Sequence, residues 1–304
     1  MGKPFLYGKI ILAKHVRMCY NSLVKDKKRG ETVQTEDRRK KIKNWIEIAV
    51  IALLCVATVV LDFVKIPYLK DELQNRWLSK IIQQTIGSVA GILLLRRLGI
   101  KLFGKPQGWL YLIPCLIVAI DNFQFYAYFN RETLGGAMQF ARTGVWDFVL
   151  FALYCFFIGL FEELIFRGVI FAVLAGIFSK DKKGLILTFV LSSVIFALSH
   201  LVNGFSIQVA YTLLTGGLFA FCLMKTRNIF CCAFVHGLYN FCGLLLGKAS
   251  ENGLGTGIVL DTGTCITMAI VGVLVGAFVV YKVLTYTEQE RSTLYAQLGI
   301  PDKE

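Results

Sequence analysis

Several signatures of soluble enzymes are missing from this 304-residue chain. It has no HExxH zinc-protease motif, no GxSxG around Ser192 or Ser193, no glycine-rich phosphate loop and no internal repeat. Nine cysteines occur, but there is no CxxC pair, and their odd number and scatter through apolar segments argue against a disulfide framework. We predict that they are small packing residues.

Hydrophobic residues are abundant instead. They make up 56% of the chain, with 13% aromatic residues, which favours a membrane protein over a soluble one. The net charge of +13 is concentrated in residues 1–44, which hold thirteen Lys or Arg against four Asp or Glu. Beside a membrane span, such a segment favours contact with anionic lipid headgroups. No nucleic-acid-binding motif accompanies it, so we expect no nucleic-acid partner.

The apolar sequence divides into lengths of about 20 residues, which is what a helix needs to cross a bilayer. This predicts an all-α, multi-pass membrane protein of about eight transmembrane helices, at residues 45–64, 78–98, 108–125, 146–178, 185–203, 206–224, 228–247 and 264–284. Lys and Arg collect in alternate connections, which predicts cytoplasmic termini and fits the plasma membrane. The expected parts are a basic cytoplasmic arm at 1–44, a transmembrane domain at 45–284 with a motif-bearing core at 146–247, and a cytoplasmic tail at 285–304.

The fourth span carries charged residues in the run Gly159 to Gly168, where such groups are costly and usually functional. Glu163 and Arg167 are spaced i, i+4 with the acid first, which favours an ion pair on one helix face. Adjacent helical residues point about 100° apart, so Glu162 needs a different partner and is a candidate general base. The alternative is that all three residues only cross-link helices or lie among lipid headgroups. At 33 residues, this span must also tilt, break or overhang.

Two of the three histidines lie in apolar segments. His200 ends the run that begins at Phe196, and His236 shares a helix face with Asn240 at i, i+4. A hairpin of the fourth and fifth spans would bring Glu162 and His200 to the same depth. Counted from its own turn, His236 is displaced from that depth by roughly 10–15 Å, which helix tilt or turns that protrude into the cytoplasm could absorb. The alternative role for both histidines is interhelical hydrogen bonding.

Three motifs therefore follow one another on separate spans: Glu162-Glu163-x-x-x-Arg167, Phe196-x-x-x-His200 and His236-x-x-x-Asn240. Together they resemble the CPBP intramembrane proteases, which include the type II CAAX prenyl endopeptidases and bacterial proteins linked to bacteriocin processing and self-immunity. The resemblance covers about residues 146–247. It implies an all-helical fold of about eight spans around a polar intramembrane cavity that opens toward the cytoplasmic side.

The resemblance also implies roles for six residues. Water activation falls to Glu162 and His200, an oxyanion hole to His236 and Asn240, and bracing of the helix to Glu163 and Arg167. The implied substrate is a membrane-associated peptide or protein. Family members are often labelled metalloproteases, and Glu162, His200 and His236 could hold zinc. Asn240 is a poor zinc ligand but a good hydrogen-bond donor, which favours a metal-independent glutamate mechanism.

Two other functions use the same residue types. A transporter also places Glu and His near the midplane, but usually shows paired halves or interrupted helices, and neither pattern is apparent here. A non-catalytic immunity or scaffold protein would use these polar residues only to hold helices together. In that case, substitution of Glu162 and His200 would lower stability rather than activity.

Overall fold

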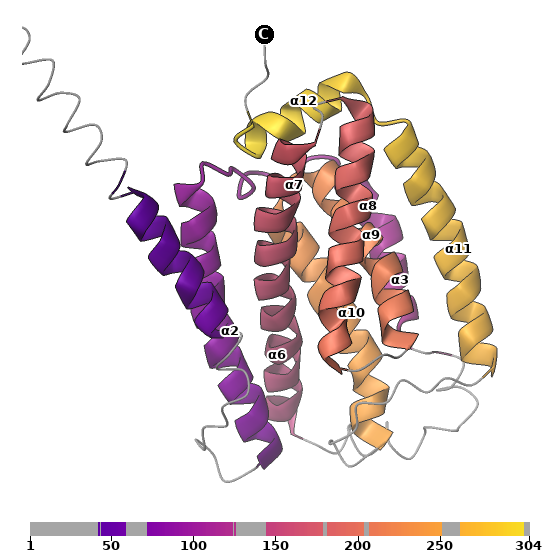
Figure 1. The fold of residues 1–304 in the computed structure, drawn as a ribbon. Helices are drawn as coiled ribbons and strands as arrows, with labels where there is room; N and C mark the ends of the chain where they lie inside the picture. Colours follow the sequence, from indigo (N-terminus) through magenta and orange to yellow (C-terminus); the bar gives the residue numbers. More distant parts are fainter. Residues whose placement is uncertain are drawn as a thin grey trace, which may run out of the picture. The chain divides into compact units, whose positions relative to one another are not determined.

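The computed structural model describes residues 42, 44–58, 72–123, 125, 144–178, 181–203, 207–250 and 262–300. Within these residues the chain is all-helical (Figure 1), as predicted. Contacts divide it into two units, Met1–Val50 and Ile51–Glu304. The described residues of the first unit are 42 and 44–50, and they are helical. Most of the basic arm, and with it the predicted lipid contact, lies outside the described residues.

The helices follow the predicted spans. They are α2 (Glu72–Arg97), η1 (Trp109–Tyr111), α3 (Leu112–Asp121), α6 (Val145–Glu163), η2 (Leu164–Ile170), α7 (Phe171–Ile177), α8 (Lys182–Ser199), η3 (His200–Asn203), α9 (Ile207–Thr226), α10 (Ile229–Ser250), α11 (Thr262–Leu284) and α12 (Glu288–Gln297). Among the described residues, five helices are long and apolar enough to cross a membrane, and three shorter ones are apolar. The chain is therefore a multi-pass membrane protein, and the total of eight spans remains a prediction.

The long fourth span forms one helical stretch, Val145–Ile177, that runs through α6, η2 and α7 (Figure 1). The helix does not break along this length, so the break considered from the sequence is absent from the span. The middle segment, η2, is a π-helix of seven residues, a wider turn that is rare and often found at functional sites. Gly168 lies in this turn, where an added Cβ would stand 2.6 Å from Leu95 Cδ1 of α2. The glycine therefore lets α2 pack directly against the π-helix.

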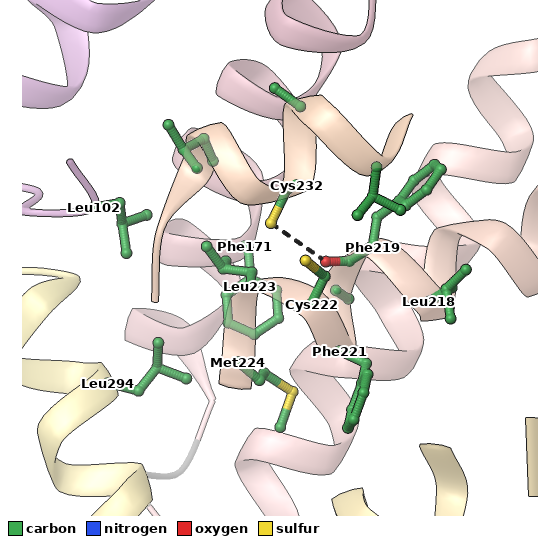
Figure 2. Packing of buried hydrophobic residues seen from close by; sticks show 14 of the residues in the cluster. Leu102, Phe171, Leu218, Phe219, Phe221, Cys222, Leu223, Met224, Cys232 and Leu294 are labelled. Carbon is green, nitrogen blue, oxygen red and sulfur yellow. Dashed lines mark hydrogen bonds between the residues drawn. The ribbon is translucent and has the colours of Figure 1, made fainter. Parts of the chain in front are cut away.

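The buried core lies between α6, α8, α9 and α10, with α2 and α3 packed against α6 and α10. Figure 2 shows part of it, where Cys232 Sγ lies 3.8 Å from the Phe219 carbonyl oxygen. The eight cysteines that the structure describes are all free, and six of them are buried. The six buried ones pack as small side chains in the core. Phe219 matters for the site because its ring stacks on that of His236.

The segment predicted as a tail contains a helix, α12. Thr287 caps it: its side chain accepts from the Glu290 amide while the Glu290 side chain accepts from the Thr287 amide. Leu294 and Tyr295 are fully buried in the core. Lys225, at the end of α9, donates to Glu290 at 2.7 Å. The helix is therefore attached to the core by apolar packing and to the end of α9 by an ion pair.

Acid is expected to weaken this attachment. Burial raises the pKa of Glu290, but hydrogen bonds from Lys225 and Thr287 outweigh burial, so its pKa lies below the ordinary value. Such a carboxylate stabilises the fold above its unfolded-state pKa of about 4.3, and the contribution is lost as the pH falls through the folded-state pKa. Glu290→Gln should therefore lower the thermal unfolding midpoint near neutral pH. This difference from wild type should shrink toward zero below about pH 4; a constant difference would contradict the assignment.

Candidate active site

The charged run of the fourth span lies where α6 passes into the π-helix. The Glu163 and Arg167 side chains are 0% and 1% exposed, and Arg167 Nη1 lies 3.2 Å from Glu163 Oε1. The predicted i, i+4 ion pair is therefore present and fully buried. The neighbouring carboxylate, Glu162, points in a different direction and is 28% exposed. The two acids thus occupy different environments, as helical geometry requires.

Arg167 joins the π-helix to α8 and α9. Its Nη2 donates to the Gly216 carbonyl oxygen at 3.0 Å. Its guanidinium carbon lies 4.2 Å from the centre of the Phe196 ring and 5.3 Å from that of Phe219. A carboxylate, a carbonyl and two aromatic faces therefore compensate for the loss of water around this buried cation.

His236 of α10 lies between the two carboxylates. Its Nδ1 is 2.8 Å from Glu163 Oε1, and its Nε2 is 3.7 Å from Glu162 Oε2. The ring stacks on Phe219 with centroids 4.4 Å apart and an interplanar angle of 21°. Because an ionised carboxylate can only accept, Nδ1 donates to Glu163, and Nε2 is directed toward Glu162. The displacement in depth expected from residue counting is wrong, since His236 contacts Glu163 directly.

His200 stands at the C-terminal end of α8, where helix carbonyls lack backbone partners. Its Nδ1 lies 2.9 Å from the Phe196 carbonyl oxygen. A carbonyl only accepts, so Nδ1 is the donor in this contact, and a neutral ring would then have a lone pair on Nε2. Among the described side chains, no hydrogen bond or ion pair joins His200 to Glu162.

Asn240 lies one turn after His236 on α10 and is half-buried. Its side chain makes no hydrogen bond with the part of the chain that the structure describes. It differs in this from Asn228, which caps the same helix by accepting from the Cys231 amide and donating to the Gly104 carbonyl. The Asn240 carboxamide is therefore not committed to holding the fold.

The zinc ligand set considered from the sequence, Glu162, His200 and His236, is not assembled. Within the described ranges, no group of three or more His, Cys, Asp or Glu side chains is arranged to hold a metal ion. The Nδ1 atoms of the two histidines bond Glu163 and the Phe196 carbonyl, so only their Nε2 atoms could serve as ligands. Such a site would require these side chains to move.

Four buried atoms of the cluster have no hydrogen-bond partner among the described residues: Glu162 Oε2, Glu163 Oε2, Arg167 Nε and Arg167 Nη1. The last of these is within ion-pair distance of Glu163 but is not aligned as a hydrogen bond. Most buried polar atoms in proteins are satisfied. Glu162 Oε2 lies within ion-pair distance of His236 Nε2, at 3.7 Å. Of these three residues only Glu162 has a partly exposed side chain, so it is the acceptor best placed to take a proton from outside the core.

Three contributors were not among the site residues predicted from the sequence. Phe219 stacks on His236, the Gly216 carbonyl accepts from Arg167, and Gly237 lies at backbone-contact distance from α6. In an apolar span, the sequence does not distinguish such residues from ordinary helix-packing residues. A backbone carbonyl gives no sequence signal at all, and only the packed structure identifies these groups.

Fold and site together define a helical multi-pass membrane protein with a buried Glu–Arg–His cluster. Residues 144–242 match the model of the Rce1-like family, the type II CAAX prenyl endopeptidases. The match covers about a third of the chain, contains all six predicted catalytic residues and confirms the resemblance that the three motifs indicate. The family is one of proteases. No curated protein and no solved structure matches the chain.

Proposed function

We propose that this chain is an intramembrane endopeptidase that hydrolyses a peptide bond in a membrane-associated protein or peptide. The main support is the buried contact between Glu163 and His236 Nδ1, with His236 Nε2 facing Glu162. These residues lie inside the region that is similar to the protease family. We further propose about eight spans around a polar cavity. The protein would lie in the plasma membrane with both termini cytoplasmic and residues 1–44 on anionic lipid.

Glu162 and His200 would activate the attacking water. Glu162 takes a proton as the water oxygen bonds to the scissile carbonyl carbon, and the lone pair of His200 Nε2 accepts a hydrogen bond that orients the water. Glu162 then gives its proton to the amide nitrogen as the C–N bond breaks, which leaves a carboxyl group and an amine. General acid–base catalysis of this kind contributes about 10²–10⁴-fold to rate.

His236 and Asn240 would stabilise the oxyanion. With Nδ1 held by Glu163, His236 can donate through Nε2 only when both ring nitrogens are protonated. In that state the formal charges of the cluster Glu162, Glu163, Arg167 and His236 sum to zero, which suits a water-poor site. Donors that are already in place cost no reorganisation during the reaction.

Asn240→Leu, a change of similar shape, should lower kcat by about 10²–10³-fold with little change in KM, because it removes an oxyanion donor. Thermal stability should not fall, since the Asn240 side chain makes no hydrogen bond with the described chain. Asn228→Leu on the same helix is the matched control. It removes a helix cap and should lower stability while the folded fraction keeps its turnover. Full turnover by Asn240→Leu would exclude it from the oxyanion hole.

The function itself is tested with purified protein in lipid vesicles and a panel of fluorogenic peptides, with and without chelator. Wild type should cleave at least one peptide, and His200→Gln should cleave it much more slowly at unchanged affinity. Loss of turnover on chelation would replace the glutamate mechanism with a metal-dependent one. No turnover by folded protein, together with lower stability of His200→Gln, would favour the non-catalytic scaffold.

A further inference from the structure

α6 and α10 touch through their backbones at two glycines beside the site. A Cβ added to Gly159 would lie 2.9 Å from Gly237 N and 3.2 Å from His236 Cβ. One added to Gly237 would lie 2.9 Å from Phe156 Cα. Non-bonded atoms pack best at about 3.5–4.0 Å. Neither methyl group fits unless the two helices separate.

The α6–α10 contact at Gly159 and Gly237, called the crossing below, is also close to the reactive groups in sequence and on the helix surface. Gly159 precedes Glu162 and Glu163 by three and four residues, so it lies one turn earlier on the same face of α6. Gly237 directly follows His236 on α10. The contact between Glu163 and His236 therefore lies about one helical turn, 5.4 Å, from the crossing. A change in helix separation at the glycines must alter that contact.

We propose that Gly159 and Gly237 are positioning residues that set the distance between His236 and the carboxylates of Glu162 and Glu163. Restoring a normal contact after adding a methyl group requires a separation of about 0.6 Å or more. The 2.8 Å bond from His236 to Glu163 would then exceed the usual 2.7–3.2 Å range. The effect on cleavage rests on the proposed function, whereas the effect on His236 does not.

The cleavage test compares Gly159→Ala and Gly237→Ala in the full-length protein. Because misplacements of about 1 Å can cost about 10²-fold in rate, we expect kcat to fall about 10–100-fold with KM changed less than about two-fold. Gly176→Ala and Gly272→Ala are matched controls on α7 and α11, where an added Cβ meets nothing within 4 Å. Both controls should keep wild-type kcat.

A second readout needs no activity. Nitrogen-15 NMR of histidine side chains reports which ring nitrogen carries the proton, and the chain has only three histidines, so His15→Gln and His200→Gln assign the signals. Wild type and the two controls should show His236 with a hydrogen-bonded Nδ1–H. Gly159→Ala and Gly237→Ala should show tautomers in exchange.

The two readouts distinguish failure of the proposed function from failure of the positioning role. Absent cleavage in wild type, with the expected NMR pattern, would remove the proposed function and leave the positioning role. Wild-type His236 signals in folded Gly159→Ala and Gly237→Ala would overturn the positioning role, whatever the cleavage rates. If neither variant folds, the wild-type spectrum decides, because a His236 ring already in tautomeric exchange is not positioned by the crossing.

Discussion

Glu162→Gln is expected to reduce peptide cleavage by about 10³-fold while thermal stability stays within about 1 kcal/mol of wild type. The amide cannot take a proton from water, so the general base is lost. Stability should hold because Glu162 is partly exposed and its Oε2 accepts no hydrogen bond within the described chain. The measurement is kcat on the best panel peptide, with thermal unfolding recorded on the same preparation.

The same Glu→Gln change at Glu288, an exposed residue of α12, serves as the control for Glu162 and should leave cleavage unchanged. Equal turnover by Glu162→Gln and wild type would exclude Glu162 as the base. If Glu162→Gln instead unfolds at a much lower temperature, Glu162 holds helices together, and the scaffold alternative gains support.

Glu163→Gln should have the largest effect on stability, a loss of about 3–5 kcal/mol, because it leaves the buried Arg167 without its carboxylate. It also removes the charged acceptor of the His236 Nδ1–H bond. The free energy of unfolding can be measured by denaturant titration in mixed micelles. A loss below about 1 kcal/mol would contradict the assignment of Glu163 and Arg167 as a buried, mutually dependent pair.

A double-mutant cycle provides the control for that pair. Arg167→Met alone should also destabilise strongly, whereas the double variant with Glu163→Gln should lose much less than the sum of the two losses, since no unpaired buried charge remains. Additive losses would show that the two residues act independently. The double variant should still lack activity, because His236 no longer has its orienting carboxylate.

Local spacing predicted much of the site. The i, i+4 order of Glu163 and Arg167 was sufficient to predict their ion pair, and the apolar lengths predicted the helices. The capping box of α12 was also readable, since Thr287 and Glu290 have the required spacing. Hydropathy alone does not reveal this helix, because it is short and has few apolar residues.

The sequence does not predict which residues of different helices contact each other. Residue counting treats all turns as lying at one depth, and this assumption misplaced His236, which bonds Glu163 in the structure. The π-helix at Leu164–Ile170 has no sequence signal in an apolar run. The possible zinc ligands are not gathered in the described part of the chain, because motif spacing does not fix the distances between the side chains of Glu162, His200 and His236.

The central claim is that this chain hydrolyses peptide bonds with water activated by Glu162. The most direct measurement is mass spectrometry of a cleaved vesicle-bound peptide after reaction in water labelled with heavy oxygen. We predict one heavy oxygen atom in the new C-terminal carboxyl group with wild type and no product above background with Glu162→Gln. Equal labelled product from both proteins, or no product from folded wild type with any peptide of the panel, would contradict the claim.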